Sequence, residues 1–387
     1  MIPYGRHCID QADIEAVIDV LRSDWLTCGP VIDHFEKTLS ETVGAKYTVA
    51  CSNGTTALHL ALLVLDITKN DVVLVPAITF LASANAARYV GADVVFVDVD
   101  PTTGLMTAQT LEDAILKNKD KNLKAVINVH LAGQCEDLDE ICKVARNYGL
   151  FIIEDAAHAI GTHYISKEGS SYPIGSNAYC DLTTFSFHPV KTIAMGEGGA
   201  ITTNDPSLAQ KLKIFRSHGM LREASQWINK NEETGPWYYE MHDLGYNYRV
   251  SDINCALGLS QLHKLENFKQ SRAQLVQKYD ELFKETKNLI PLRKVYSSDT
   301  SWHLYVLLID FHNFGVTRRN LMRYLKEQGI GTQVHYIPFY KQPYYQKLYG
   351  ETSLPGAEEY YSKCLSLPLY VGLTFEHQEI IINSFPK

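Results

Sequence analysis

Residues 125–129 read AVINV, residues 137–148 read DLDEICKVARNY and residues 151–154 read FIIE. The first and last runs are apolar and too short for a typical helix, which predicts two strands buried on both faces. Apolar residues of the middle segment, such as Leu138 and Ile141, recur at the spacing of one helical face. A strand, a helix and a second strand in this order predict a mainly parallel sheet, and therefore an α/β fold.

Further short apolar runs extend this pattern toward the N-terminus, at Tyr47 to Cys51, Val72 to Val75 and Val94 to Val97. Ligands of parallel sheets bind beyond the carboxyl ends of the strands. Three polar segments fall at such ends and are expected to converge on one crevice: 52–54, 76–80 and Asp155.

The chain of 387 residues, 45% of them hydrophobic, exceeds the size at which one core usually divides into two. We predict a large domain over 1–250 that begins with an amphipathic helix from Asp10 to Arg22. A smaller α+β domain is predicted over 251–387, with a long helical stretch at 251–286 and strands at 303–309 and 331–336. Residues 222–243 are aromatic and polar without periodicity, which favours an excursion or an interface loop.

Composition excludes several classes of protein. The formal net charge of −8 lacks the excess of lysine and arginine that a nucleic-acid surface needs. No signal core or membrane-length apolar run is present, so we expect a soluble, cytoplasmic protein. The eight cysteines show no metal-ligand spacing, which predicts reduced thiols and no metal site.

The segment Ser52-Asn53-Gly54-Thr55-Thr56-Ala57 follows a predicted strand and opens a predicted helix. Glycine allows close approach of the backbone, and a helix N-terminus attracts anions. The segment is therefore a candidate phosphate site, although an ordinary helix start has the same pattern.

Asp155 ends the FIIE strand, where a buried carboxylate needs a partner. A protonated pyridine nitrogen is one candidate partner, and a helix cap or an internal salt bridge are the alternatives. His158 follows in an alanine-rich turn, where it could hydrogen-bond a ligand or simply pack.

Ser186 and Lys191 lie five residues apart at the end of another predicted strand, before a Gly196-Glu197-Gly198-Gly199 turn and a strand from Ala200 to Thr203. Lysine is the residue that forms an imine with an aldehyde. Lys191 is therefore a candidate nucleophile, although a solvated surface lysine is the common alternative.

Together these motifs resemble the DegT/StrS family of nucleotide-sugar aminotransferases. The resemblance extends over most of the chain, including the segments 154–159, 186–191, 196–199, 215–219 and 245–249. It implies an aspartate-aminotransferase-like, fold type I enzyme with a seven-stranded sheet and pyridoxal 5'-phosphate as cofactor. Lysine at 191, where some members with dehydratase activity have histidine, favours transamination. Histidine stands at 158, where many members have glutamine.

The resemblance also implies roles for individual residues. Lys191 is expected to hold the cofactor as a Schiff base and then to act as the acid and base of the proton shift. Asp155 is expected to bind the pyridine nitrogen, His158 the phenolic oxygen, and Phe80 the face of the ring. Gly54, Thr55 and Ser186 would hold the phosphate, and Asn247 would reach it from the second subunit of a homodimer.

The segments 215–221, 256–262 and 333–338 resemble the members that aminate C4 of a UDP-linked 4-keto-6-deoxy sugar in pseudaminic acid biosynthesis. L-Glutamate is the implied amino donor. The residues implied to line the substrate site are Tyr4, Trp25, Leu26, Thr27, His303, Tyr305 and His335. Another UDP-4-keto-6-deoxy sugar is an open alternative, and a cofactor-binding regulator without turnover is a second one.

Overall fold

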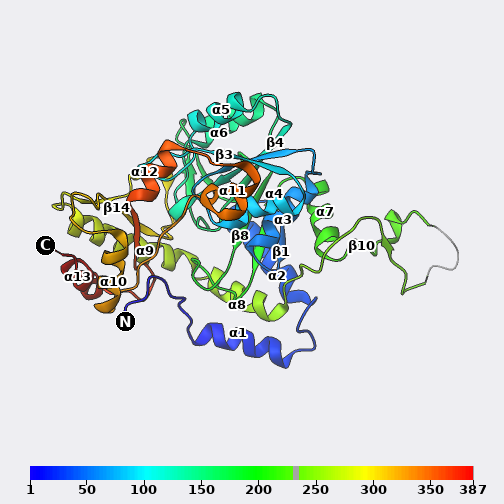
Figure 1. Ribbon diagram of the computed structural model, residues 1–387. Coiled ribbons are helices and arrows are strands. Elements are labelled where there is room, and N and C mark those ends of the chain that lie inside the picture. The colour runs from blue at the N-terminus through cyan, green and yellow to red at the C-terminus, as the bar shows by residue number, and fades with distance from the viewer. Residues whose placement is uncertain (230–234, 387) are drawn as a thin grey trace.

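The computed structural model describes residues 1–229 and 235–386, and its centre is a seven-stranded sheet (Figure 1). The strand order is β1-β9-β8-β5-β4-β2-β3, and β9 is the one strand of this sheet that runs antiparallel to its neighbours. The strands span Tyr47–Cys51 (β1), Val72–Pro76 (β2), Asp93–Val97 (β3), Leu123–Val129 (β4), Phe151–Asp155 (β5), Leu182–Ser186 (β8) and Gly199–Thr203 (β9). The predicted α/β class and the mainly parallel sheet are confirmed.

Side chains of the central strands alternate between two apolar layers, which explains why the strands read as uninterrupted apolar runs. In β4, for example, Ile127 belongs to one core and Val126 to the other. Helices α3 (Gly54–Val64), α4 (Leu81–Tyr89) and α7 (Pro206–Arg216) supply the first core, and α5 (Ala108–Lys117) and α6 (Leu138–Asn147) supply the second. Helix α2 (Pro30–Val43) packs in a third core against the same sheet.

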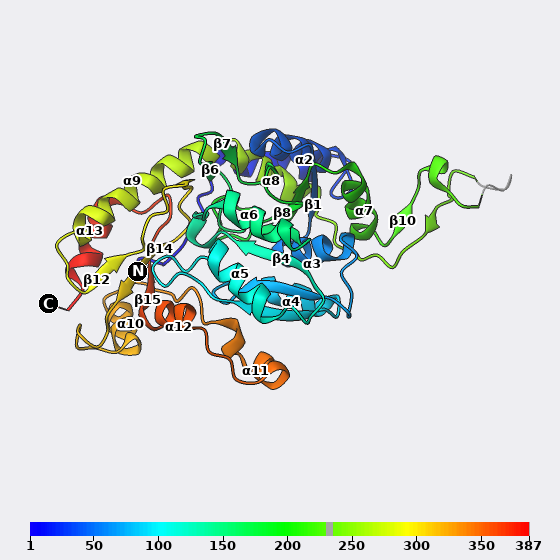
Figure 2. The same cartoon turned by 90° about the horizontal axis from the view of Figure 1, so that it is seen from above.

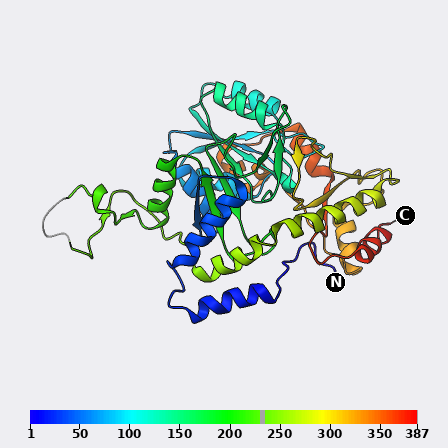
Figure 3. The same cartoon turned by 180° about the vertical axis from the view of Figure 1, so that it is seen from behind.

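The predicted N-terminal helix is present as α1 (Gln11–Arg22), and Asp10 caps it in a capping box with Asp13. Two of its apolar residues, Ile14 and Leu21, are 45% and 56% exposed. Asp13 is buried instead, with its carboxylate bonded to Gln261 and Ser260 of α8 (Asp252–Leu262). Figure 3 shows α1 at the edge of the molecule, next to α8, on which it packs.

The C-terminal part is built on a second, three-stranded sheet of order β12-β14-β15 (Leu289–Pro291, Tyr305–Ile309, Cys364–Leu367). Helices α9 (Leu265–Phe283), α10 (Arg318–Glu327) and α13 (Phe375–Asn383) contribute to its core, and two further helices are α11 (Pro343–Tyr349) and α12 (Pro355–Lys363). Figure 2 shows α9 leading out from the sheet domain toward these elements. The division at 250/251 stays a prediction, and α8 packs on α1 and α2.

The helical stretch expected at 251–286 is present as two helices, α8 and α9, with a break at His263 and Lys264. One prediction for this part was wrong. The strand expected at 331–336 is reduced to a single bridge between Gln333 and Ser366. The backbone of 333–336 instead enters the cleft described below.

The segment predicted as an excursion projects from the body beyond a short hairpin of β10 (Met220–Leu221) and β11 (Glu240–Met241) (Figures 1 and 2). Trp227 packs edge-on against Tyr238 with ring centroids 4.7 Å apart. Residues 230–234 of the predicted excursion lie outside the described residues. The interface role of this segment stays a prediction.

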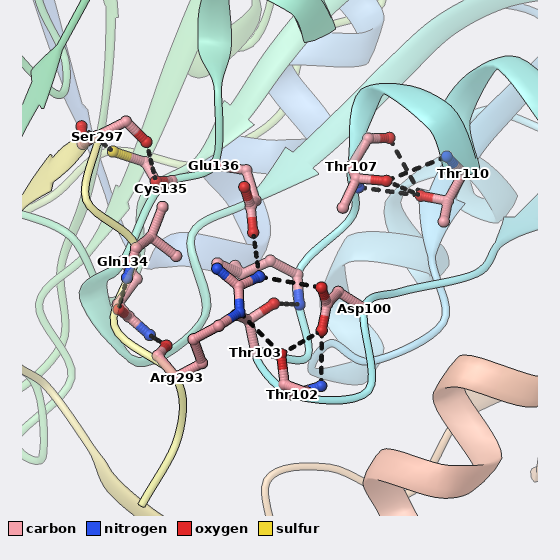
Figure 4. A network of polar contacts seen from close by, with 12 residues as sticks. Asp100, Thr102, Thr103, Thr107, Thr110, Gln134, Cys135, Glu136, Arg293 and Ser297 are labelled. Carbon is pink, nitrogen blue, oxygen red and sulfur yellow. Dashed lines mark hydrogen bonds and ion pairs between the residues drawn. The ribbon is translucent and has the colours of Figure 1, made fainter.

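Arg293, which follows β12, joins the C-terminal part to two loops of the large sheet (Figure 4). Its guanidinium contacts Asp100 at 3.0 Å, Thr102 at 3.0 Å and Glu136 at 3.6 Å. Nearby, the Gln134 side chain accepts a hydrogen bond from the Val295 backbone at 2.9 Å. These contacts fix the C-terminal part against the ends of strands β3 and β4.

A search of the described residues gives no helix whose length and apolarity suit a membrane crossing. It also gives no cluster of three histidine, cysteine or carboxylate side chains arranged to hold a metal ion.

Candidate active site

A cleft of about 590 Å³ opens beyond the carboxyl ends of β1, β5 and β8, at the place that the sequence predicted. The large domain lines it with Gly54, Thr55, Phe80, Asp155, His158, Ser186 and Lys191. The N-terminal segment and the C-terminal part add Tyr4, His303, Gln333, Val334, His335 and Tyr336. Both parts of the chain therefore form the walls of one site.

Lys191 lies in the turn after β8, where its backbone N–H donates to the His188 carbonyl at 2.8 Å. Its side chain lines the cleft. Burial lowers the pKa of the Lys191 amine to about 8, and the Asp155 carboxylate nearby opposes that shift. A substantial fraction of the amine is therefore neutral near physiological pH, as a nucleophilic amine must be.

The lowered pKa of Lys191 determines how the capture of pyridoxal phosphate should depend on pH. Below pH 8 most of the Lys191 amine carries a proton, and above pH 8 most of it is neutral. We expect the rate at which cofactor-free protein captures pyridoxal phosphate to rise with pH and to level off above about 8. Stopped-flow absorbance measures that rate. An inflection near 10.5, the ordinary value for lysine, would contradict the assignment.

Asp155 is 7% exposed and ends β5 inside the cleft. Its carboxylate accepts hydrogen bonds from the Ser83 hydroxyl at 2.7 Å and from the Ala157 backbone at 3.2 Å. Thr79 contacts the Ser83 hydroxyl at 2.7 Å. In the described residues no lysine, arginine or histidine forms an ion pair with Asp155. A buried carboxylate held in place, yet without a cation, suits a protonated ring nitrogen.

The start of α3 has the geometry of a helix N-terminus that could accept the anion predicted there. Asn53 caps the helix by accepting from the Thr56 backbone at 2.9 Å. The backbone N–H groups of Gly54 and Thr55 have no hydrogen-bond acceptor within the described part of the chain. Two free donors at a helix N-terminus, beside the Ser186 hydroxyl, suit a phosphate group.

Gly54 is required for this geometry, because a Cβ at residue 54 would lie 2.7 Å from the Ser186 Cβ. We expect Gly54→Ala to displace Ser186 and to weaken cofactor binding about 10-fold or more, as hydrogen bonds to a charged group are lost. Gly372→Ala is the matched control, since its nearest contact would be an ordinary 3.8 Å. Equilibrium titration of the cofactor-free proteins measures both. Equal affinity of the two variants would contradict this account.

Three histidines line the cleft together with Asp155: His158, His303 and His335. The rings of His158 and His303 are 4.3 Å apart, and His335 Nδ1 lies 2.7 Å from the Ser366 hydroxyl. Burial lowers the pKa of His158 and of His303 well below the ordinary value, and it lowers that of His335 to about 3. All three rings are therefore neutral, and none adds a second cation next to Lys191.

The cleft does not contain every residue that the sequence implied. Tyr305 was expected to line the substrate site, and this expectation was wrong. The side chain is buried in the C-terminal core against Tyr279, and its hydroxyl donates to Asp280 at 3.0 Å. Trp25, Leu26 and Thr27 lie on the surface between α1 and α2, outside the cleft of this chain. Asn247 is exposed beside Ser217 and also lies outside the cleft.

No site role was predicted for Thr79, Ser83 or Tyr336, although Thr79 lies in the segment 76–80 that was expected at the crevice. Thr79 lies just before α4 and Ser83 in its first turn, far along the chain from Asp155. Tyr336 contacts His158 across the two parts of the chain. Contacts between residues so far apart along the chain leave no local sequence pattern, so only the folded structure shows them.

Comparisons with known proteins agree with this geometry. Residues 7–386 match the model of the DegT/DnrJ/EryC1/StrS aminotransferase family. The spore coat polysaccharide biosynthesis protein SpsC of Bacillus subtilis is 39% identical, with 99% of this chain and 96% of SpsC covered. The UDP-4-amino-4,6-dideoxy-N-acetyl-beta-L-altrosamine transaminase of Campylobacter jejuni (strain 81-176) is 37% identical, with 98% and 96% covered.

Two solved structures superpose closely, both at 31% identity. PseC of Helicobacter pylori, an aminotransferase involved in the biosynthesis of pseudoaminic acid, gives a TM-score of 0.88 over 99% of this chain and 98% of PseC. The PLP form of a putative sugar aminotransferase from Streptococcus pneumoniae, Spr1654, gives 0.87 over 99% and 97%. The match of nearly the whole chain, with a lysine, a buried aspartate and a helix N-terminus in one cleft, leads to one conclusion. The chain belongs to the DegT/DnrJ/EryC1/StrS aminotransferase family.

Proposed function

We propose that this sugar aminotransferase transfers the amino group of L-glutamate to C4 of UDP-2-acetamido-2,6-dideoxy-β-L-arabino-hex-4-ulose, as a step of pseudaminic acid biosynthesis in the cytoplasm. The observation that carries the chemistry is the Lys191 amine, with its pKa lowered to about 8, in one cleft with the buried Asp155 carboxylate. The sugar is supported by the similarity to the Campylobacter jejuni transaminase.

The cleft fits pyridoxal 5'-phosphate at four places. Gly54 and Thr55 offer free backbone donors for the phosphate, with Ser186 beside them. Asp155 offers a carboxylate without a cation, and Lys191 offers the amine. Phe80, which is 57% exposed at the cleft wall, offers an aromatic face for the ring. These residues are proposed to hold the cofactor.

When bound, pyridoxal phosphate supplies an electron sink for the carbon that gains or loses the amino group. The protein supplies proton transfer and position. Lys191 Nζ would remove the proton from the carbon that loses the amino group and, in the other half of the reaction, would deliver one to the carbon that gains it, because its lowered pKa lets it exchange protons near neutral pH. Asp155 would hold a proton on the ring nitrogen, and the hydroxyls of Ser83 and Thr79 keep the Asp155 carboxylate in place.

We propose that the enzyme is a homodimer with shared sites, in which Asn247 reaches the partner's cofactor phosphate. Asn247 is exposed, and the exposed apolar residues of the N-terminal region, Ile14, Leu21, Trp25 and Leu26, form a surface that a partner would cover.

Subunit mixing tests this proposal. Lys191→Ala and Asn247→Ala homodimers are each expected to be impaired, because each variant damages both sites of its dimer. After exchange at equal amounts, about a quarter of the sites are intact, which restores activity. Activity equal to the average of the two separate variants would contradict sharing.

A substrate panel tests the sugar. Purified protein is incubated with L-glutamate and either the proposed sugar or its C5 epimer, and the 4-amino product is followed by mass spectrometry and NMR. We expect turnover of the L-arabino sugar. Exclusive turnover of the other epimer would favour a different UDP-4-keto-6-deoxy sugar, which is the second candidate.

The least favoured alternative is a regulator that binds the cofactor without turnover. Glutamate alone distinguishes it, because a transaminase converts its bound cofactor to the pyridoxamine form and a silent binder does not.

A further inference from the structure

His158 and Tyr336 form a hydrogen-bonded pair across the two parts of the chain. His158 lies in the turn after β5, and Tyr336 lies in the extended segment that begins near Gln333. The Tyr336 hydroxyl is 3.2 Å from His158 Nε2, and the two rings are nearly parallel, with an angle of 22°. Both side chains line the cleft.

The second nitrogen of His158 does not reach the cleft. Nδ1 is shielded from solvent and has no hydrogen-bond partner within the described residues, and the ring packs on His303. Because burial lowers the pKa of His158 well below its ordinary value, the imidazole is neutral and carries a single proton. Only Nε2 can therefore exchange a hydrogen bond with a ligand.

The position of that proton follows from the unpaired Nδ1. A buried N–H without an acceptor is rarer in folded proteins than a buried acceptor without a donor. The proton is therefore expected on Nε2, from which it is donated to the Tyr336 oxygen. Tyr336 then accepts from His158 and retains its own proton, and the structure gives the hydroxyl no other hydrogen bond within the described residues.

We propose that Tyr336, in place of His158 as the resemblance implied, donates this proton in a hydrogen bond to the phenolic oxygen of the cofactor, and that His158 acts behind it as a positioning residue. The ring of Tyr336 is 6.0 Å from that of Phe80, the residue proposed to stack on the cofactor. Two successive hydrogen bonds polarise each other, so the hydroxyl becomes a stronger donor than a lone tyrosine. The proposal rests on the proposed function, because it requires a cofactor with a phenolic oxygen.

The first test measures the affinity of cofactor-free protein for pyridoxal phosphate. Tyr336→Phe keeps the ring and removes only the hydroxyl, so we expect binding about 10-fold to 100-fold weaker, as for a lost hydrogen bond to a charged group. Tyr340→Phe is the matched control, because Tyr340 lies in the same segment, outside the cleft, and its hydroxyl faces Glu358 at 3.5 Å. We expect it to bind the cofactor as the unaltered protein does. An affinity of Tyr336→Phe within threefold of the unaltered protein would overturn the proposal.

The second test measures the unaltered protein without its cofactor. ¹⁵N NMR of cofactor-free protein labelled at histidine reports which ring nitrogen carries the proton, and His158→Gln identifies the signal. We expect protonation at Nε2. Protonation at Nδ1 overturns the proposal, because Tyr336 would then donate to His158 and have no proton left for a ligand. Failure of the unaltered protein to bind pyridoxal phosphate would refute the proposed function instead, whatever the NMR result.

Discussion

Lys191→Ala is expected to lower kcat on the order of 10³-fold or more while the protein remains folded. The variant loses the amine that is proposed both to bond the cofactor and to move the proton, and no other lysine lines the cleft within the described residues. The fold should persist, because the side chain serves chemistry rather than core packing. Single-turnover and steady-state assays with circular dichroism measure both quantities.

Lys143→Ala is the control for Lys191→Ala. Lys143 is exposed on α6 and forms only a surface ion pair with Glu140 at 3.7 Å. We expect activity within twofold of the unaltered enzyme. Comparable activities of the two variants would show that the nucleophile lies elsewhere.

Asp155→Asn is expected to give the second largest loss, about 100-fold in kcat, because a neutral amide cannot hold a proton on the ring nitrogen as the carboxylate does. The replacement has the same shape and can still accept from Ser83. Cofactor content should therefore fall much less than kcat. Absorbance of the bound cofactor and initial rates separate the two effects.

Glu154→Gln provides the matched comparison for Asp155→Asn. Glu154 is the preceding residue of β5 and is also buried, but it lies outside the cleft and faces His130 at 3.3 Å. We expect its replacement to affect the melting temperature rather than the rate per folded molecule. A kcat of Asp155→Asn within threefold of that of the unaltered enzyme would show that Asp155 takes no part in the chemistry.

The sheet was predictable because its strands are buried on both faces, which leaves short apolar runs such as those of β4 and β5. Helical periodicity predicted α1, but periodicity does not show what covers an apolar face, and Ile14 and Leu21 are 45% and 56% exposed. The predicted helical stretch at 251–286 is also present, with a break at His263 and Lys264 that apolar periodicity did not show.

The residues of the site also differ in how well the sequence predicts them. Lys191, Asp155, Ser186 and Gly54 stand at strand ends, where chain order alone places them in one crevice. Ser83 contacts Asp155 from helix α4 and Tyr336 lines the crevice from the C-terminal part, and neither role was predicted, because contacts between such distant segments leave no local pattern. Tyr305 was misplaced because β14 turns it into the C-terminal core, two residues after His303, which does line the cleft.

The central claim is that Lys191 carries the cofactor, and borohydride reduction tests it most directly. Reduction of the protein loaded with pyridoxal phosphate fixes the link to the lysine, and peptide mass spectrometry then locates it. We predict a pyridoxyl group on Lys191, and its absence from protein treated with L-glutamate before reduction. A pyridoxyl group on another lysine, or none on the loaded protein, would contradict the account.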